Sequence, residues 1–131
     1  MGAHPYQYVV DYDEDVQAAL DRLRQDVFRR RAYRGAGRGA RSPDEALAQS
    51  DEAGTRSILD ITHLSSRPAQ CAAAPVPEEE RERYFGTSLP TLAAVEESDA
   101  FWGELERGEA RYLPVLDGVT KRLLFVGYSF D

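Results

Sequence analysis

The C-terminal quarter of the chain carries the pattern that most constrains the fold. Two runs rich in aliphatic and aromatic residues, ARYLPVL and KRLLFVGYSF, lie on either side of Asp117-Gly118. An Asp-Gly pair between two strand-like runs favours a tight hairpin turn, because both residue types tolerate left-handed backbone. The sequence therefore predicts a C-terminal β-hairpin.

The second strand of this hairpin is apolar on both of its faces. One face carries Leu124, Val126 and Tyr128, and the other carries Leu123 and Phe125. A strand of this kind is typical of the interior of a sheet that is covered on both sides, by helices alone or by helices and a second chain. Pro114 lacks an amide donor, so we expect the preceding strand to lie towards an edge.

The rest of the chain alternates between strand-like and helical patterns. Hydrophobic spacing predicts strands at 6–12, 58–62 and 71–76, and helices at about 13–33, 43–50, 78–85 and 91–107. Helical spacing also suits residues 58–64, but β-branching favours the strand. Pro75 suggests that 71–76 is an edge strand. The order predicts a single domain, 1–131, of the α+β class: a mixed four- to five-stranded sheet with helices packed mainly on one face.

Charge and composition restrict the classes of function. The net charge of −7 repels phosphate, which disfavours nucleic acid and anionic membranes as partners. No apolar run approaches the roughly 20 residues of a membrane helix. One cysteine allows no internal disulfide, and the N-terminus shows no signal-peptide pattern. Fifteen arginines, one lysine and no asparagine indicate a GC-rich genome. We therefore expect a soluble, cytoplasmic, bacterial protein.

Possible catalytic residues gather in the stretch GTRSILDITHLSSRPAQC. Ser57, Asp60 and His63 invite comparison with a nucleophile–base–carboxylate relay. A strand would place Ser57 and His63 on one side and Asp60 on the other, with the outer two about 20 Å apart. We therefore expect no relay, and Arg56, Asp60 and His63 stay as catalytic candidates only for an alternative function.

Metal or cofactor binding is not indicated by the sequence. Two histidines and one cysteine occur without any metal-binding spacing, so no metal and no cofactor are predicted. Cys71 could pair with His63, but its place in CAAAP favours a small buried apolar residue.

An arginine-rich loop is the sharpest charge feature. The run RRRAYRGAGRGAR holds six arginines and no acid. It also matches a loose dinucleotide fingerprint, but it follows a predicted helix, whereas that fingerprint must follow a strand. We expect a neutralised helix end and a solvated loop. Arg34, Arg38 and Arg41 are the candidates for contact with phosphate or with an acidic partner.

The tyrosines provide a further candidate surface. Tyr6, Tyr8 and Tyr12 share a face of the first strand, and Tyr128 and Phe130 share a face of the last. If these strands are neighbours, a tyrosine-lined surface results that suits a ligand or a dimer interface. The candidate ligand-binding residues are Tyr8, Arg56, Ser57 and Tyr128.

Two functional hypotheses follow. The first is an acidic, non-catalytic module that binds another protein, of immunity or regulatory type, with a homo-oligomer as a further arrangement. The alternative is a small enzyme or small-ligand binder, for instance of a biosynthetic pathway, with its site near residues 54–71 and the tyrosine-rich strands.

Overall fold

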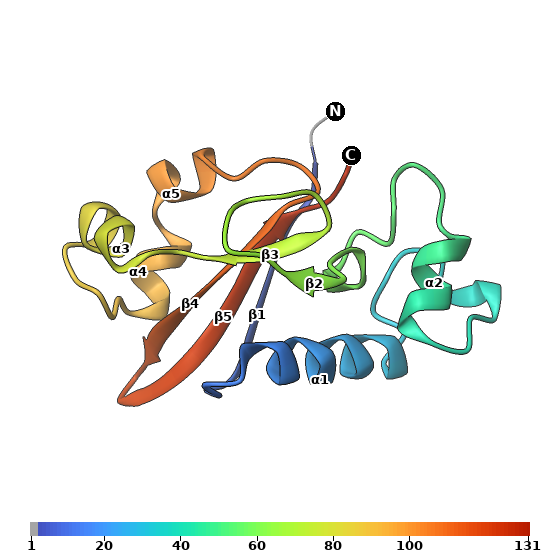
Figure 1. The fold of residues 1–131 in the computed structure, drawn as a ribbon, viewed down its shortest axis with the longest axis horizontal. Coiled ribbons are helices and arrows are strands. Elements are labelled where there is room, and N and C mark those ends of the chain that lie inside the picture. The colour runs from blue at the N-terminus through green and yellow to red at the C-terminus, as the bar shows by residue number, and fades with distance from the viewer. Residues whose placement is uncertain (1–2) are drawn as a thin grey trace.

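The computed structural model describes residues 3–131 and has the predicted α+β architecture (Figure 1). The elements in chain order are β1 (Pro5–Asp11), α1 (Val16–Arg29), η1 (Ala36–Arg38), α2 (Pro43–Gln49), η2 (Ile58–Asp60), β2 (His63–Leu64), β3 (Ala72–Pro75), α3 (Glu78–Phe85), α4 (Leu92–Glu96), α5 (Asp99–Gly103), β4 (Ala110–Asp117) and β5 (Thr120–Tyr128). The five strands form one mixed sheet in the order β1-β5-β4-β3-β2. Strand β3 runs parallel to both of its neighbours, while β5 is antiparallel to β1 and β4.

The C-terminal hairpin is present as predicted. Strands β4 and β5 pair from Ala110↔Gly127 to Asp117↔Thr120, and Gly118 adopts a φ of 65° in the turn. Strand β5 lies between β1 and β4, which fits its apolar residues on both faces. Strand β1 is at the edge of the sheet, since among residues 3–131 it pairs only with β5.

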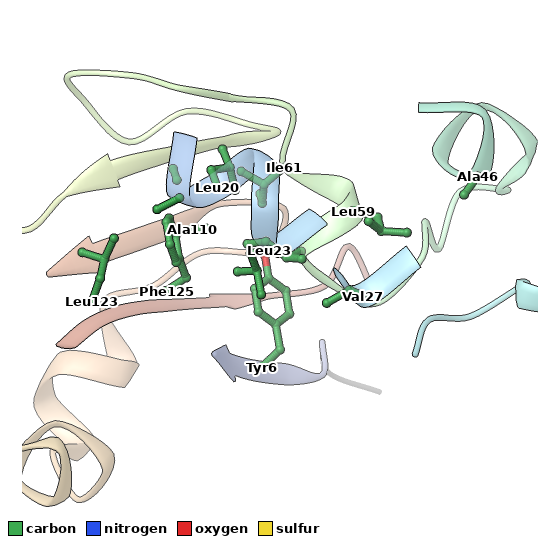
Figure 2. Packing of buried hydrophobic residues seen from close by; sticks show 13 residues of the cluster. Tyr6, Leu20, Leu23, Val27, Ala46, Leu59, Ile61, Ala110, Leu123 and Phe125 are labelled. Carbon is green, nitrogen blue, oxygen red and sulfur yellow. The ribbon is translucent and has the colours of Figure 1, made fainter. Parts of the chain in front are cut away.

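Helices cover both faces of the sheet, whereas the sequence predicted them mainly on one. On the first face, α1 and η2 pack against Tyr6 and Phe125 (Figure 2). On the second face, Val95 of α4 and Phe101 of α5 pack against Leu124 and neighbouring strand residues. Two hydrophobic cores therefore hold the sheet between them.

The predicted strand over 58–62 is wrong. Residues Ile58–Asp60 form the 3-10 turn η2, which Ser57 caps by accepting a hydrogen bond from the Leu59 amide at 3.1 Å. The predicted helix over 91–107 is divided into α4 and α5. Ser98 starts α5 by accepting a hydrogen bond from the Phe101 amide at 3.2 Å. In both places a serine hydroxyl begins a new element, as expected of a good N-cap residue.

The two strands predicted near an edge are interior in the strand order. Strand β3 lies between β2 and β4, but β2 reaches only as far as Ala73, so Pro75 lies beyond its pairing. Strand β4 lies between β3 and β5, but β3 ends opposite Tyr112, before Pro114. Both prolines therefore occupy places where the ladder on one side has ended, which is where a missing amide donor costs least.

The boundaries of the other helices follow local capping. Helix α1 begins one residue after Asp15, whose carboxylate accepts a hydrogen bond from the Ala18 amide, and is shorter than the predicted 13–33. Helix α2 has Ser42 as its N-cap and proline in its first turn, and α3 ends at Gly86. None of the helices within residues 3–131 has the length and apolar character needed to cross a membrane.

Candidate functional site

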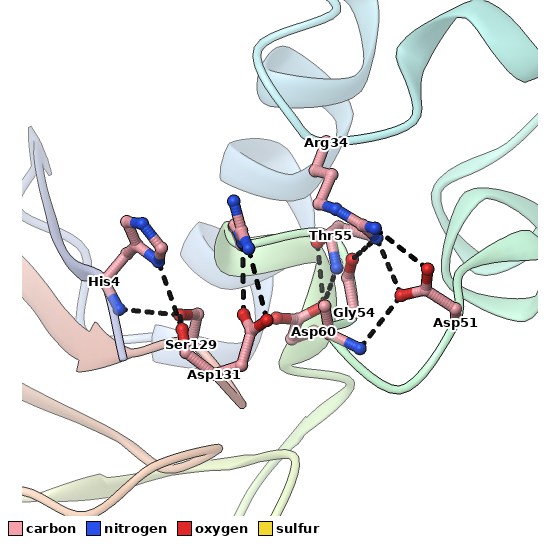
Figure 3. A network of polar contacts seen from close by, with 10 residues as sticks. His4, Arg34, Asp51, Gly54, Thr55, Asp60, Ser129 and Asp131 are labelled. Atoms are coloured by element: carbon pink, nitrogen blue, oxygen red, sulfur yellow. Dashed lines mark hydrogen bonds and ion pairs between the residues drawn. The ribbon is translucent and has the colours of Figure 1, made fainter. Parts of the chain in front are cut away.

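Asp60 organises the turn from Gly54 to η2 (Figure 3). Its Oδ1 accepts hydrogen bonds from the amide and the hydroxyl of Thr55 at 2.7 and 2.8 Å. Because Thr55 gives its only hydroxyl proton to Asp60, the Ser57 hydroxyl must be the donor in its 2.8 Å contact with Thr55 Oγ1. The turn thus joins Ser57 and Asp60 through Thr55, although a strand would have separated them.

This network is buried, and burial shifts the pKa of its carboxyl group. Asp60 is 1% exposed, and its Oδ2 has no hydrogen-bond partner among the described residues. Burial raises the pKa of the Asp60 carboxyl, while hydrogen bonds from Thr55 and the charge of Arg24 lower it. Burial also raises the pKa of Tyr8, whose hydroxyl accepts a 3.4 Å hydrogen bond from the Ile58 amide. These groups therefore form hydrogen bonds with one another and with the backbone of the turn.

His63 and Arg56 lie outside this buried network. His63 is exposed on β2, and its Nδ1 is 2.9 Å from Thr62 Oγ1. Arg56 is exposed and forms a two-bond ion pair with the Asp131 carboxylate at 3.1 and 3.2 Å. Across residues 3–131, the hydrogen bonds and ion pairs join neither Arg56 nor His63 to the Asp60 carboxylate through their side chains. Burial raises the pKa of the Cys71 thiol, which disfavours a reactive thiolate there.

The C-terminal residues cover the Asp60 turn. A Cβ atom on Gly54 would lie 2.6 Å from the Phe130 ring and 2.8 Å from Asp60 Oδ1, and a Cβ on Gly108 would meet the same ring. The ring therefore fits between two glycines that have positive φ. Next to it, the Ser129 hydroxyl accepts a 2.8 Å hydrogen bond from the His4 amide. Local sequence gives no signal for this packing, because the two glycines and Phe130 are distant along the chain.

Two of the three candidate loop arginines hold their own loop together. Arg34 makes two hydrogen bonds to the Asp51 carboxylate, at 2.7 and 2.8 Å, and lowers the pKa of that carboxyl to about 2. Arg38 donates to the Gln49 carbonyl at 2.8 Å. Arg41 is exposed. The expected helix end and loop are therefore tied to the chain that follows, which leaves Arg41 the most available of the three.

The tyrosines do not form one surface. Strands β1 and β5 are neighbours, but Pro5 lies opposite Tyr128 and Tyr6 lies opposite Gly127. Tyr6 and Tyr8 therefore face the core beneath α1, with ring centroids 5.8 Å apart, while Tyr128 faces the other side. There its ring contacts Trp102 of α5, at a centroid distance of 5.8 Å and an interplanar angle of 86°.

A groove next to β1 contains the Trp102–Tyr128 pair. Its volume is about 460 Å³, and we call it the acidic aromatic groove; its lining residues are Pro5, Tyr6, Gln7, Glu96, Asp99, Trp102 and Tyr128. Gln7 Nε2 donates to Glu96 Oε2 at 2.6 Å, which joins β1 to the end of α4. The groove was not predicted, because the sequence indicated one helix over 91–107, whereas the structure divides it into α4 and α5 and so brings Glu96, Asp99 and Trp102 to the groove. The acidic run EESD, shortly before the tryptophan, was the available signal.

The groove adjoins the free edge of β1. In the β1–β5 pairing, the Ser129 amide donates to the His4 carbonyl at 3.0 Å, so even-numbered residues of β1 direct their backbone groups towards β5. The amides of Gln7 and Val9 therefore point away from the sheet. Pro5 and Gln7 belong both to this edge and to the groove.

No metal-binding cluster of three or more histidine, cysteine, aspartate or glutamate residues occurs between residues 3 and 131. Comparison with known proteins gives no relative from which a function could be transferred: no family model matches the chain, and neither the curated proteins nor the solved structures give a match.

Proposed function

We propose that this chain is a protein-binding module that pairs an extended segment of its partner with the outer edge of β1. The observation that carries the proposal is the position of β1, a seven-residue edge strand with a groove beside it. Unpaired strand edges bind peptides through main-chain hydrogen bonds, and adjacent pockets that hold side chains provide specificity.

A binding role accounts for the candidate residues more simply than a catalytic one. Asp60 and Ser57 direct their hydrogen bonds into their own turn, and Arg56 is paired with Asp131. The proposed action is therefore regulatory or immunity-type: the module occupies a segment of its partner and leaves it chemically unchanged. We place this action in the cytoplasm, because the single cysteine fits a reducing compartment.

Synthetic peptides test the edge pairing directly. The probe is a capped nonapeptide of alternating threonine and valine with lysine at position 5, and it is N-methylated at every even position. The amide N–H groups of its odd-numbered residues remain free to donate to the backbone carbonyls of Gln7 and Val9. We expect calorimetric titration to detect binding. N-methylation of every position removes the donors from both edges of the peptide and should weaken binding by about tenfold or more.

The fully methylated peptide is the control, because it has the same side chains in the same order and lacks only the free amide donors. Equal affinities of the even-methylated and fully methylated peptides would contradict edge pairing, and so would an absence of binding by the even-methylated peptide.

A further inference from the structure

We infer that the acidic aromatic groove receives a lysine or arginine side chain of the bound segment. This inference rests on the proposed pairing with β1 and specifies the chemistry of the partner: an extended segment with a cationic residue on the groove side.

Within the part of the chain that the structure describes, the carboxylates of the groove have no cationic partner in it. Nine arginine–carboxylate ion pairs occur in the described part of the chain, and neither Glu96 nor Asp99 takes part in any of them. Among residues 3–131, no lysine or arginine lines the groove. Arg107 lines a separate hollow that borders the same aromatic pair. The groove therefore presents negative charge that a partner's cation can neutralise.

The aromatic pair adds a surface suited to a cation. Indole is the side chain most favourable for cation–π contact, and such contacts strengthen where water is partly excluded. Trp102 is half-buried, and its Nε1 donates to the Val95 carbonyl at 3.1 Å. This hydrogen bond fixes one edge of the indole. Tyr128 meets it nearly at a right angle, so the two rings form a corner.

The register places partner side chains beside this corner. A residue directly opposite Gln7 on an added strand would project its side chain on the same face as that of Gln7. That face holds the groove, because Pro5 and Gln7 line it. On an added strand that runs antiparallel to β1, all residues whose amides point towards β1 share this face, since side chains alternate with the backbone groups. A cation at one of these positions is therefore directed towards Glu96 and Asp99.

A second copy of the chain is a poorer occupant of this edge. Strand β1 has the sequence PYQYVVD, so another β1 would bring a carboxylate and no cationic side chain. Each copy also carries a net charge of −7. Charge complementarity therefore favours a basic segment of a different protein.

The single tryptophan of the chain is Trp102, so intrinsic fluorescence reports directly on the groove. The probe is the even-methylated nonapeptide with lysine, arginine, norleucine or glutamate at position 5. We expect lysine or arginine to bind about tenfold more tightly than norleucine at low salt, with glutamate weakest. The difference should shrink in 0.5 M NaCl. Moving lysine to position 4 turns its side chain to the α1 face and should remove the advantage.

A matched pair of variants localises the effect. Asp99→Asn should reduce the preference for lysine over norleucine to about threefold or less. Asp117→Asn removes an exposed carboxylate from the distant hairpin turn and should leave the preference unchanged. Equal binding of the lysine and norleucine peptides would overturn the cation site while leaving edge pairing intact. Absence of binding by every peptide would remove both proposals. A dimer in sedimentation that the lysine peptide does not dissociate would instead assign the edge to a second copy.

Discussion

At the scale of single residues, Gly54 is a position where the structure tolerates little change. It combines a φ of 66° with close approach to both Phe130 and Asp60. A side chain there would strain the backbone and displace either the ring that covers the turn or the carboxylate that organises it. The stability of the Asp60 turn therefore depends on a residue that has no side chain.

We predict that Gly54→Ala destabilises the protein by about 3 kcal/mol or more, from left-handed strain and displaced packing together. Gly39→Ala is the matched control, because Gly39 has a φ of 78° and open space around its Cβ position. That variant should lose only about 1–2 kcal/mol. Urea denaturation measures both free energies of unfolding. Equal losses would show that Phe130 does not pack tightly against Gly54.

At the scale of elements, Arg24 joins three segments. It is 8% exposed on α1, and its guanidinium donates to the Leu59 carbonyl of η2 at 3.1 Å and to the Asp44 carboxylate of α2 at 3.0 Å. The first contact satisfies a buried backbone acceptor. The second reaches a side chain that is 82% exposed, where water screens the charge.

These contacts predict that removal of the Arg24 side chain and removal of the Asp44 side chain lower the free energy of unfolding by different amounts. Arg24→Ala should cost about 2–3 kcal/mol, because a buried carbonyl loses its donor and the packing of the long side chain is lost. Asp44→Ala should cost less than about 1 kcal/mol. Thermal and urea unfolding of the two variants provide the comparison. A larger loss for Asp44→Ala would assign the stabilisation to the ion pair instead of to the carbonyl contact.

Elements with strong local signals could be predicted from the sequence. The hairpin around Asp117-Gly118, the Ser42-Pro43 helix start and the helix ending at Gly86 all appear as expected. The segment after Ser57 was misassigned because hydrogen bonds among Thr55, Ser57 and Asp60 outweigh the strand preference of its isoleucines. Local propensity cannot anticipate a network of this kind, which burial strengthens.

At the scale of the whole molecule, strand order decides which residues form a site. The sequence indicated that β5 is central, but it did not give the order of the strands or the register of β1 against β5. That register turns Tyr128 away from Tyr6 and Tyr8 and towards Trp102. The groove is thus assembled from β1, β5, α4 and α5, which no local pattern connects.

The most direct test of the proposed function is amide hydrogen exchange in β1, measured by NMR with and without the even-methylated lysine peptide. The amides of Gln7 and Val9 point outwards, while those of Tyr8 and Val10 already pair with β5 and serve as internal controls. We predict that saturating peptide slows exchange at Gln7 and Val9 by about tenfold or more, with a much smaller change at Tyr8 and Val10. Bound peptide that leaves Gln7 and Val9 unprotected would contradict pairing at this edge.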